Sequence, residues 1–463
     1  MKKIIIYVNI NVYNILARQR KAKDVKLNYK RTVLVGLAFL TIQAVWQLYN
    51  TEIPIMLEKM IGDLLVEAGK GAYVSGEVVT DFPINTVVNA IMSVDNVMAV
   101  FLLPILGRVS DNTNTRFGKR TPYIAVGVLA AAIALPFVPL FYAKNSIVGV
   151  AIMLGVILLA MSIYRSPAVA LMPDVTPKSV RSKANAVINL MGAAGTVLVV
   201  IAAFIIGKIF VSGVPFYTAL FIATAVIMVV AFIVFIRTVN EPQLVALMPA
   251  EEEETEEERL IREGVGIKMD SSKFCSLVFL LLAVAFAYMA YGAIETNFSR
   301  YAKDILGLDN AQKSLPLMVA MGSALVCFVL FAFISNKLGR KNVVLIGVSL
   351  LSVCAVLASF ITNMAVLYIL FSLIGIAWAA INVNFYPMVV EMAKGSDIGK
   401  YTGIFYTFQM AAQIATPLLS GVLIDVFRNS FGMRILFPYA AVFLVLSLVS
   451  IIFVRHGEAA EEY

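Results

Sequence analysis

The sequence contains a single histidine, three cysteines and few charged residues. Its 463 residues are 60% hydrophobic and only 14% charged. With one histidine, His456, no histidine cluster for a metal or for His-based catalysis can be built, and no glycine-rich phosphate-binding loop is found. Cys275, Cys327 and Cys354 fall within apolar runs, which favours small buried side chains over a disulfide framework. We therefore expect no enzyme, no metal and no cofactor.

Long apolar runs dominate the chain, and its mean hydropathy is +0.87. A bilayer core about 30 Å thick needs about 20 apolar residues per helix. Together these features predict an all-α membrane protein with twelve transmembrane helices. The predicted spans are 32–55, 86–106, 122–142, 147–171, 185–210, 215–237, 274–297, 314–334, 342–361, 365–388, 402–424 and 435–454.

The formal net charge of +8 reflects orientation in a membrane and does not indicate binding to nucleic acid. Most Lys and Arg residues fall in the segments that share a side with the N-terminus, and the positive-inside rule places that side in the cytosol. We expect a multi-pass protein of the cell membrane with both termini cytosolic. One loop is an exception, because Arg300, Lys303 and Lys313 after the seventh span are expected outside.

The chain looks internally duplicated. Asp174 and Glu391 each close an apolar run ahead of a basic loop, and they lie 217 residues apart. Duplicated membrane halves are typical of secondary transporters that bind solute between two bundles. An acidic run at 251–258 separates the halves and is expected to stay solvated. The predicted parts are a cytosolic segment 1–31, a six-helix bundle 32–239, an acidic cytosolic linker 240–272, a second six-helix bundle 273–455 and a cytosolic tail 456–463.

The outer segment from about 56 to 85 has apolar residues at helical spacing, among them Met56, Met60 and Leu64. An extension of the first helix is favoured over a helix lying along the outer membrane interface.

A loop with a carboxylate and several basic residues joins the second and third spans. Gly107 permits close helix packing, Asp111 offers an acceptor, and Arg116, Lys119 and Arg120 offer donors. Such a cluster can latch one conformation of a two-state protein, although the basic residues alone could simply follow the positive-inside rule. A degenerate copy of this loop at 336–341 favours a gating role over the positive-inside rule as the explanation. The predicted gating residues are Gly107, Asp111, Arg116, Gly118, Lys119, Arg120, Asp174, Gly339, Arg340, Lys341 and Glu391.

This loop resembles the G-x-x-x-D-(R/K)-x-G-(R/K)-(R/K) signature of the major facilitator superfamily, with extra residues between Asp111 and Gly118. The R-F-G-K-R-x-P-Y form, the segment 164–195 and the Asp95–Asn96 pair resemble the sucrose-type proton symporters and the glycoside-pentoside-hexuronide symporters. The resemblance runs from the first to the twelfth helix. It implies two pseudo-symmetric six-helix bundles and a sugar or glycoside carried with a cation, usually a proton. Sucrose-type carriers have an Arg where this chain has Val169, and Arg165 lies one helical turn earlier.

Ionisable residues inside a bilayer are costly and are therefore functional candidates. Asp95 is the only carboxylate well within an apolar run. We predict that Asp95 and Arg165 couple transport to a cation, with Asp95 as the proton site. The alternatives are a carboxylate that serves packing alone and an arginine bonded to helix carbonyls. Depths of about 24 Å for Asp95 and about 14 Å for Arg165 do not imply a direct ion pair.

Sugar sites combine hydrogen-bonding side chains with aromatic platforms, and four predicted helices carry such residues along one face. An alternative for any single stripe is a hydrogen-bonded seam between helices. The predicted substrate-binding residues are Gln43, Trp46, Gln47, Asn50, Asn96, Tyr288, Tyr291, Glu295, Trp378, Asn382, Tyr406 and Gln409.

The sequence thus predicts a secondary active transporter that imports a sugar or glycoside, a disaccharide in the first instance, by alternating access coupled to a proton or another cation. Alternatives are an exporter of drug-like or other small solutes on the same fold and a solute sensor that does not transport. The expected partners are the sugar, the coupling cation and the lipid bilayer. We expect a monomer.

Overall fold

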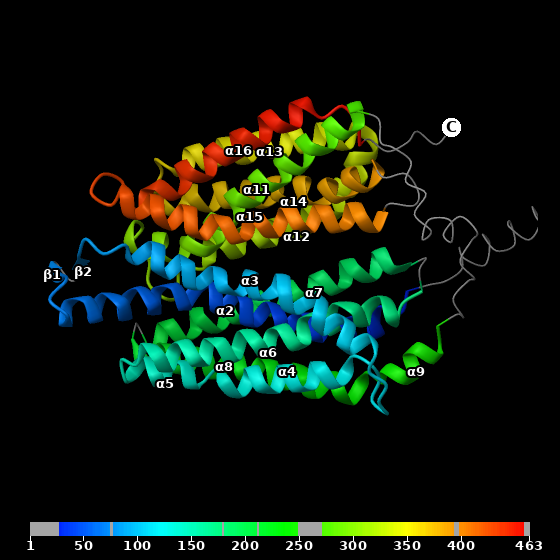
Figure 1. Ribbon diagram of the computed structural model, residues 1–463, viewed down its shortest axis with the longest axis horizontal. Coiled ribbons are helices and arrows are strands. Elements are labelled where there is room, and N and C mark those ends of the chain that lie inside the picture. Colours follow the sequence, from blue (N-terminus) through cyan, green and yellow to red (C-terminus); the bar gives the residue numbers. More distant parts are fainter. Residues whose placement is uncertain are drawn as a thin grey trace, which may run out of the picture.

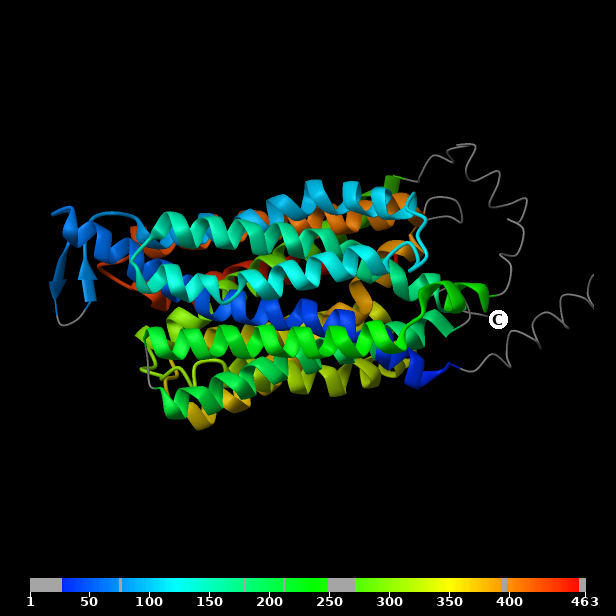
Figure 2. The same ribbon diagram turned by 90° about the horizontal axis from the view of Figure 1, so that it is seen from below.

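The computed structural model describes residues 27–74, 77–177, 180–210, 213–248, 271–392 and 398–457, which form a long bundle of helices (Figures 1 and 2). Most of the predicted terminal segments and of the acidic linker lies outside these residues. The N-terminal half contains α2 Tyr29–Glu67, β1 Ala72–Val74, β2 Glu77–Val79, α3 Ile84–Asp111, α4 Thr121–Ala134, α5 Phe137–Ala143, α6 Ile147–Asp174, α7 Arg181–Ile209, α8 Val214–Thr238 and α9 Glu241–Ala246. The C-terminal half contains α11 Ser271–Asp304, α12 Leu315–Leu338, α13 Arg340–Ala358, α14 Met364–Glu391, α15 Ile398–Val426, the short 3₁₀ helix η2 Gly432–Ile435 and α16 Leu436–Phe453.

The described helices have the length and apolarity of membrane spans. Within the described ranges, 11 helices are long and apolar enough to cross a bilayer, and α12 adds a shorter apolar stretch, Leu315–Phe328. Helices α4 and α5 together form one span, Thr121–Ala143. The break between them falls at Pro136, whose ring removes a backbone donor. An all-α membrane protein is therefore confirmed, and α12 holds the position of the remaining predicted span.

The two halves have the same internal packing. In the first half, α2 packs on α7 and α8, α4 packs on α6 and α8, and α3 packs on α6. In the second half, α11 packs on α15 and α16, α13 packs on α14 and α16, and α12 packs on α14. Each of these contacts in one half thus has its counterpart in the other, and Figure 1 shows the halves as two groups of helices lying side by side. This is the pair of pseudo-symmetric bundles that the sequence predicts.

Each half also has its own hydrophobic core. One cluster of buried residues runs from Val35 to Val239, and two others lie between Leu277 and Val454. None of these three clusters of described residues includes members of both halves. Close helix contacts support the packing, as at Gly195 of α7, where a Cβ would collide with the backbone of Leu40 in α2. The bundles are therefore two separately packed bodies that meet at a shared interface.

The bundle has two distinct ends (Figures 1 and 2). We call the end that carries β1 and β2 the hairpin end, and the end that carries α9 the linker end. Helix α2 runs on to Glu67, so the predicted extension of the first helix is confirmed, with Met56 and Met60 buried. The antiparallel pair of β1 and β2, in which Ala72 lies opposite Val79, was not predicted.

Candidate functional site

A small polar cavity lies inside the first bundle. Asp95, Ala99 and Leu103 lie at helical spacing on α3, and residues of α6 face them across the cavity. Its volume is about 10 Å³, which is room for about one water molecule. The cavity is lined by Trp46, Asp95, Ala99, Leu103, Leu158, Met161, Ser162 and Arg165. The two residues predicted for cation coupling therefore share one cavity.

Asp95 and Arg165 have different surroundings within it. Asp95 accepts a hydrogen bond from the Nδ2 of Asn96 at 3.0 Å. The Cζ of Arg165 lies 5.5 Å from the centre of the Trp46 ring, which is a cation–π distance. Within the described residues no ion pair joins Asp95 to Arg165. This agrees with their unequal predicted depths.

An aromatic platform with an attached hydrogen bond lies in the second bundle. Tyr291 of α11 stacks on Trp378 of α14, with ring centres 4.3 Å apart and planes 6° apart. Tyr288 meets the same tryptophan edge-on at 5.2 Å, and its hydroxyl donates to the Oδ1 of Asn382 at 2.8 Å. These four residues were predicted from two separate helices, and the fold brings them together. They offer a flat apolar face beside polar side chains.

One contact between predicted residues crosses from one bundle to the other. The Nδ2 of Asn50 on α2 donates to the Oε1 of Glu295 on α11 at 3.3 Å. Gln47 lies half-buried on α2, one turn before Thr51, and Gln43 is exposed. Asn50 and Glu295 thus place polar groups where the two halves meet.

The predicted residues of α15, Tyr406 and Gln409, form none of these hydrogen bonds. The ring of Tyr406 is 49% exposed and lies 6.2 Å from that of Tyr386. Gln409 is half-buried and forms no hydrogen bond with another described residue. Neither residue therefore joins the hydrogen bonds described above, although Tyr406 lies near Tyr288 of the aromatic platform.

At the linker end, each bundle contains an ion pair at equivalent places. The Nε of Arg120 donates to the Oδ2 of Asp174 at 2.8 Å, and Arg120 also pairs with Asp111. In the second bundle the Nη1 of Arg340 lies 3.2 Å from the Oε2 of Glu391. Asp174 and Glu391 are the acids related by the repeat, so the duplication extends to the ion pairs. Each pair joins two residues of the same bundle.

The other basic residues of the loop act differently from the prediction. The described contacts bring Arg120, but not Arg116 or Lys119, to Asp111. Arg116 lies over the ring of Phe117 at 4.7 Å, and Lys119 contributes its backbone N–H to Glu241. The side chains of a tight loop point in several directions, so spacing alone did not show which one reaches the acid.

Glu241 is a buried residue that sequence reasoning missed. It lies at the start of α9 and accepts hydrogen bonds from the backbone N–H groups of Lys119, Arg120 and Thr121. These N–H groups begin α4, where a helix has no internal acceptors. Gly118 has φ +105, and a Cβ there would collide with the Glu241 side chain. The sequence signal for this role was an acid followed by Pro242 just after the sixth span, a pattern typical of the start of a helix.

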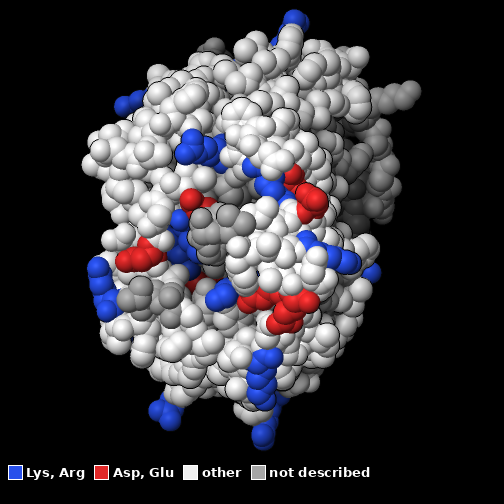
Figure 3. Space-filling model, turned by 90° about the vertical axis from the view of Figure 1, so that its left-hand side faces the viewer, with Lys and Arg blue, Asp and Glu red and all other residues white. Residues whose placement is uncertain are grey.

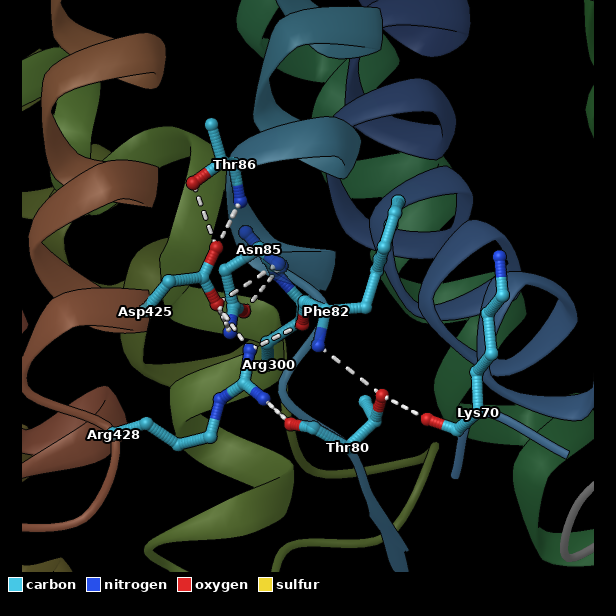
Figure 4. A network of polar contacts seen from close by, with 8 residues as sticks. All are labelled: Lys70, Thr80, Phe82, Asn85, Thr86, Arg300, Asp425 and Arg428. Atoms are coloured by element: carbon cyan, nitrogen blue, oxygen red, sulfur yellow. Dashed lines mark hydrogen bonds and ion pairs between the residues drawn. The ribbon is translucent and has the colours of Figure 1, made fainter. Parts of the chain in front are cut away.

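Residues of both bundles are joined at the hairpin end (Figure 4). Asp425 of α15 accepts from the backbone N–H and the hydroxyl of Thr86, each at 2.7 Å, and from the Nδ2 of Asn85 at 2.9 Å. Arg428 holds the same carboxylate at 2.9 Å and also donates to the carbonyl groups of Thr80 and Phe82. The N-cap residue of α3 is a proline with no side-chain cap, so α15 supplies the acceptor from the opposite bundle.

Arg300 lies beneath this contact and is fully buried. It donates to Asn85 at 2.9 Å and to the side-chain oxygens of Asn89 and Asn297. The prediction that Arg300 lies in an outer loop was wrong, because α11 continues to Asp304 and carries it inside the bundle. Asn85, Asn89 and Asp425 were also missed, since their partners lie more than 200 residues away along the chain.

A second buried contact joins the bundles near the same end. The Nζ of Lys313, just before α12, lies 2.7 Å from the Oε2 of Glu52 on α2, and their side chains are 1% and 0% exposed. The sequence placed Lys313 in the loop after the seventh span, where the structure also has it, but its burial was not predicted. Figure 3 shows the surface of this end, where acidic and basic side chains are interspersed. Among the described residues, most salt bridges and side-chain hydrogen bonds between the two bundles therefore lie toward the hairpin end.

Two pseudo-symmetric helical bundles with polar groups along their interface define a membrane transporter of the major facilitator fold. Residues 83–455 match the family described as MFS/sugar transport protein, and the chain belongs to this family. It is accordingly a multi-pass membrane transport protein that acts on a small-molecule substrate, and not a member of an enzyme family.

Solved structures share the fold at low sequence identity. A bacterial homologue of the iron transporter ferroportin in its inward-facing state has a TM-score of 0.64 and 13% identity, covering 93% of this chain and 100% of that chain. An auto-inhibited POT family peptide transporter has a TM-score of 0.64 and 10% identity, covering 94% and 98%. A bacterial homologue of the human lysosomal transporter Spinster, inward-facing and occupied, has a TM-score of 0.59 and 12% identity, covering 93% and 95%. No curated protein matches the sequence.

Proposed function

We propose that this protein imports a sugar or glycoside together with a proton, by alternating access of a site between its two bundles. The observation that carries the proposal is the platform of Tyr291 on Trp378 beside the Tyr288–Asn382 hydrogen bond. A sugar presents apolar ring faces and many hydroxyl groups, so it suits a flat aromatic surface flanked by amide and hydroxyl groups. Asn50 and Glu295 add a polar contact from both bundles to the same binding region.

The distribution of contacts supports a state that is closed at the hairpin end. The hydrogen bonds of Asp425 and the buried pair of Glu52 with Lys313 hold the bundles together there. At the linker end the pairs of Arg120 with Asp174 and Arg340 with Glu391 remain inside their own bundles. With the linker end in the cytosol, closure of the hairpin end favours an inward-facing arrangement, and the ion pairs of Arg120 and Arg340 brace each bundle as a rigid unit. We propose a monomer in the cell membrane with cytosolic termini.

Asp95 is the proposed proton site. It lies in a water-sized cavity inside a bilayer span, and Arg165 lines the same cavity. An acid in such a place can take up a proton from one side and release it to the other as the bundles move. Trp46 lines the same cavity as Asp95, and Asn96 donates a hydrogen bond to it. A change in the charge of Asp95 therefore acts directly on two of the predicted substrate-binding residues.

The test is uptake of labelled sugars into proteoliposomes that contain the purified full chain. We expect a panel of mono- and disaccharides to reveal accumulation under an imposed proton gradient, inside alkaline. Asp95→Asn should abolish gradient-driven accumulation while exchange of labelled for unlabelled sugar continues. Asp81→Asn, a change of the same charge at an exposed position, is the control. Undiminished accumulation by Asp95→Asn would show that the coupling assignment is wrong. No uptake or exchange of any sugar would refute sugar transport.

A further inference from the structure

Three buried polar atoms along α2 have no hydrogen-bond partner among the described residues. They are the Nε1 of Trp46, the hydroxyl of Tyr49 and the Oε1 of Glu52, and we call these residues the α2 row. The residues follow at intervals of three, so each lies about 4.5 Å further along the helix axis than the one before. A buried polar group without a protein partner is costly, and ordered water is its usual partner. The α2 row therefore points to bound water inside the first bundle.

The inner end of the α2 row reaches the cavity of Asp95. Trp46 lines that cavity, and its ring meets the ring of Tyr49 edge-on with centres 5.6 Å apart. Tyr49 is 3% exposed, and the charge of Asp95 acts on its hydroxyl. A tyrosine hydroxyl both donates and accepts a proton in hydrogen bonds, whereas an indole only donates. Tyr49 is thus the member of the row that can pass a proton toward the acid.

The outer end of the α2 row is covered by an ammonium group. The Nζ of Lys313 lies 2.7 Å from the Oε2 of Glu52 and also donates to the Oδ1 of Asn310. The charge of Glu52 acts as well on Tyr217 of α8, whose ring meets that of Tyr142 with centres 5.2 Å apart. Tyr142 lies on α5, which ends at the hairpin end of the bundle. Polar side chains therefore continue from Glu52 toward that end.

Lys313 belongs to the second bundle, whereas the α2 row belongs to the first. The segment that carries Lys313 docks closely on α7, because a Cβ at Gly207 would lie 2.8 Å from the backbone nitrogen of Ala311. Opening of the hairpin end separates the bundles and so withdraws the ammonium from Glu52. A carboxylate paired with an ammonium stays ionised, and one released from it into water can accept a proton.

We propose that Glu52 is the outer entry point of the coupling proton and that Tyr49, with water bound at its hydroxyl, carries this proton to Asp95. This inference rests on the proposed function, in which Asp95 is the proton site. With the hairpin end open, the Glu52 carboxylate takes a proton from external water and becomes a carboxylic acid. It gives a proton through water to the Tyr49 oxygen, which releases its own proton through water to the Asp95 carboxylate. Glu52 is then ionised again, Tyr49 is unchanged and Asp95 is neutral.

The same arrangement keeps proton entry in step with the movement of the bundles. When the hairpin end closes, Lys313 returns to Glu52, holds it ionised and repels a further cation. The sugar passes between the bundles, whereas the proton passes inside the first one. External protons therefore reach Asp95 only while the hairpin end is open, which prevents a leak in the closed state.

Proton entry without any sugar tests this route. The purified full chain is reconstituted in vesicles that contain the pH-sensitive dye pyranine, and a potassium diffusion potential, inside negative, drives protons inward. The wild type should admit protons no faster than protein-free vesicles. Lys313→Met removes the ammonium and should speed proton entry several-fold. Lys313→Gln keeps a donor for Glu52 and should act in the same direction, and it serves as the test if the methionine variant does not fold.

Second substitutions in the Lys313 variant identify the path. Tyr49→Phe removes an oxygen that has no partner in the described part of the chain, so the stability should be kept. Proton entry should nevertheless slow by about tenfold or more, since a positioned proton-transfer group contributes about 10²–10⁴-fold. Glu52→Gln and Asp95→Asn should slow it likewise. Tyr439→Phe removes the hydroxyl of a buried tyrosine in the second bundle and is the control, which should leave the rate unchanged.

The outcomes separate this inference from the proposed function. Loss of the fast entry in all three combinations, with no loss in the control, supports the route. No faster entry in the Lys313 variants would overturn it. Fast entry that persists with Tyr49→Phe or Glu52→Gln but is lost with Asp95→Asn would overturn the route and leave Asp95 as the proton site. Fast entry that persists with Asp95→Asn as well would refute both.

Discussion

Replacing Asp425 by asparagine should shift the protein toward a state that is open at the hairpin end. The Asp425 side chain is 7% exposed and accepts hydrogen bonds from Asn85, Thr86 and Arg428. Asparagine keeps the shape but replaces one acceptor oxygen with a donor and removes the charge. Hydrogen bonds to a charged group contribute about 1.5–3 kcal/mol each, and the bonds to one carboxylate are not additive. We therefore expect a shift of about 2 kcal/mol, or about 30-fold in the ratio of the two states.

The assay is the distance between spin labels on the two bundles. Lys144 and Phe360 are exposed residues at the hairpin end, one in each half. With the three native cysteines replaced and these positions labelled, the wild type should give one short-distance population by pulsed electron paramagnetic resonance. Asp425→Asn should add a population at longer distance. A second labelled pair, Arg237 with Lys337 at the linker end, should shorten at the same time.

The control is Asp81→Asn, which makes the same chemical change at an exposed residue close to the start of α3. It should leave both distance distributions as they are in the wild type. If Asp425→Asn also leaves the hairpin-end distances unchanged, the contact between α3 and α15 does not set the balance between states. Lengthening at both ends together would instead indicate a general loosening of the bundles, and the reasoning would fail.

The remaining predictions concern stability and are measured by thermal unfolding of the purified protein in detergent. Lys313→Met should destabilise the folded protein by about 3–5 kcal/mol because it leaves Glu52 charged and buried. Adding Glu52→Leu should recover most of this loss. A double variant no more stable than Lys313→Met would contradict the prediction. Glu241→Gln should lower the melting temperature, since an amide N–H₂ would face backbone donors at the start of α4. Gly118→Ala should do the same through its positive φ and the collision with Glu241, and a neutral result would refute that packing argument.

The class of fold was predictable because its signals are local and repeated. Apolar runs of about 20 residues mark membrane helices wherever they occur. The acids Asp174 and Glu391 revealed the duplication, and both now appear in equivalent ion pairs. Spacing along single helices also placed Tyr288 and Tyr291 on one face, and these meet Trp378 in the structure.

Contacts between distant segments were not predictable in the same way. Asn85 and Asp425 are separated by 340 residues, and nothing in the pattern around either one names the other. Arg300 was misplaced because charged residues at the end of an apolar run usually indicate the end of a membrane helix. In the structure the helix continues, and three asparagine side chains accept hydrogen bonds from the two terminal nitrogens of the guanidinium inside the bundle.

The separate cores of the two halves bear on how the chain is made. Ribosomes deliver the first bundle to the membrane while the second is still being synthesised, and domains generally fold as units in that order. The cluster from Val35 to Val239 needs no residue from beyond α8, so the first bundle can complete its packing early. Docking of the later bundle then depends on the packing of α3 against α15 and on the polar contacts between bundles, such as Asp425 with Thr86 and Asn50 with Glu295. In the alternating-access cycle proposed above, some of these contacts would have to break and re-form.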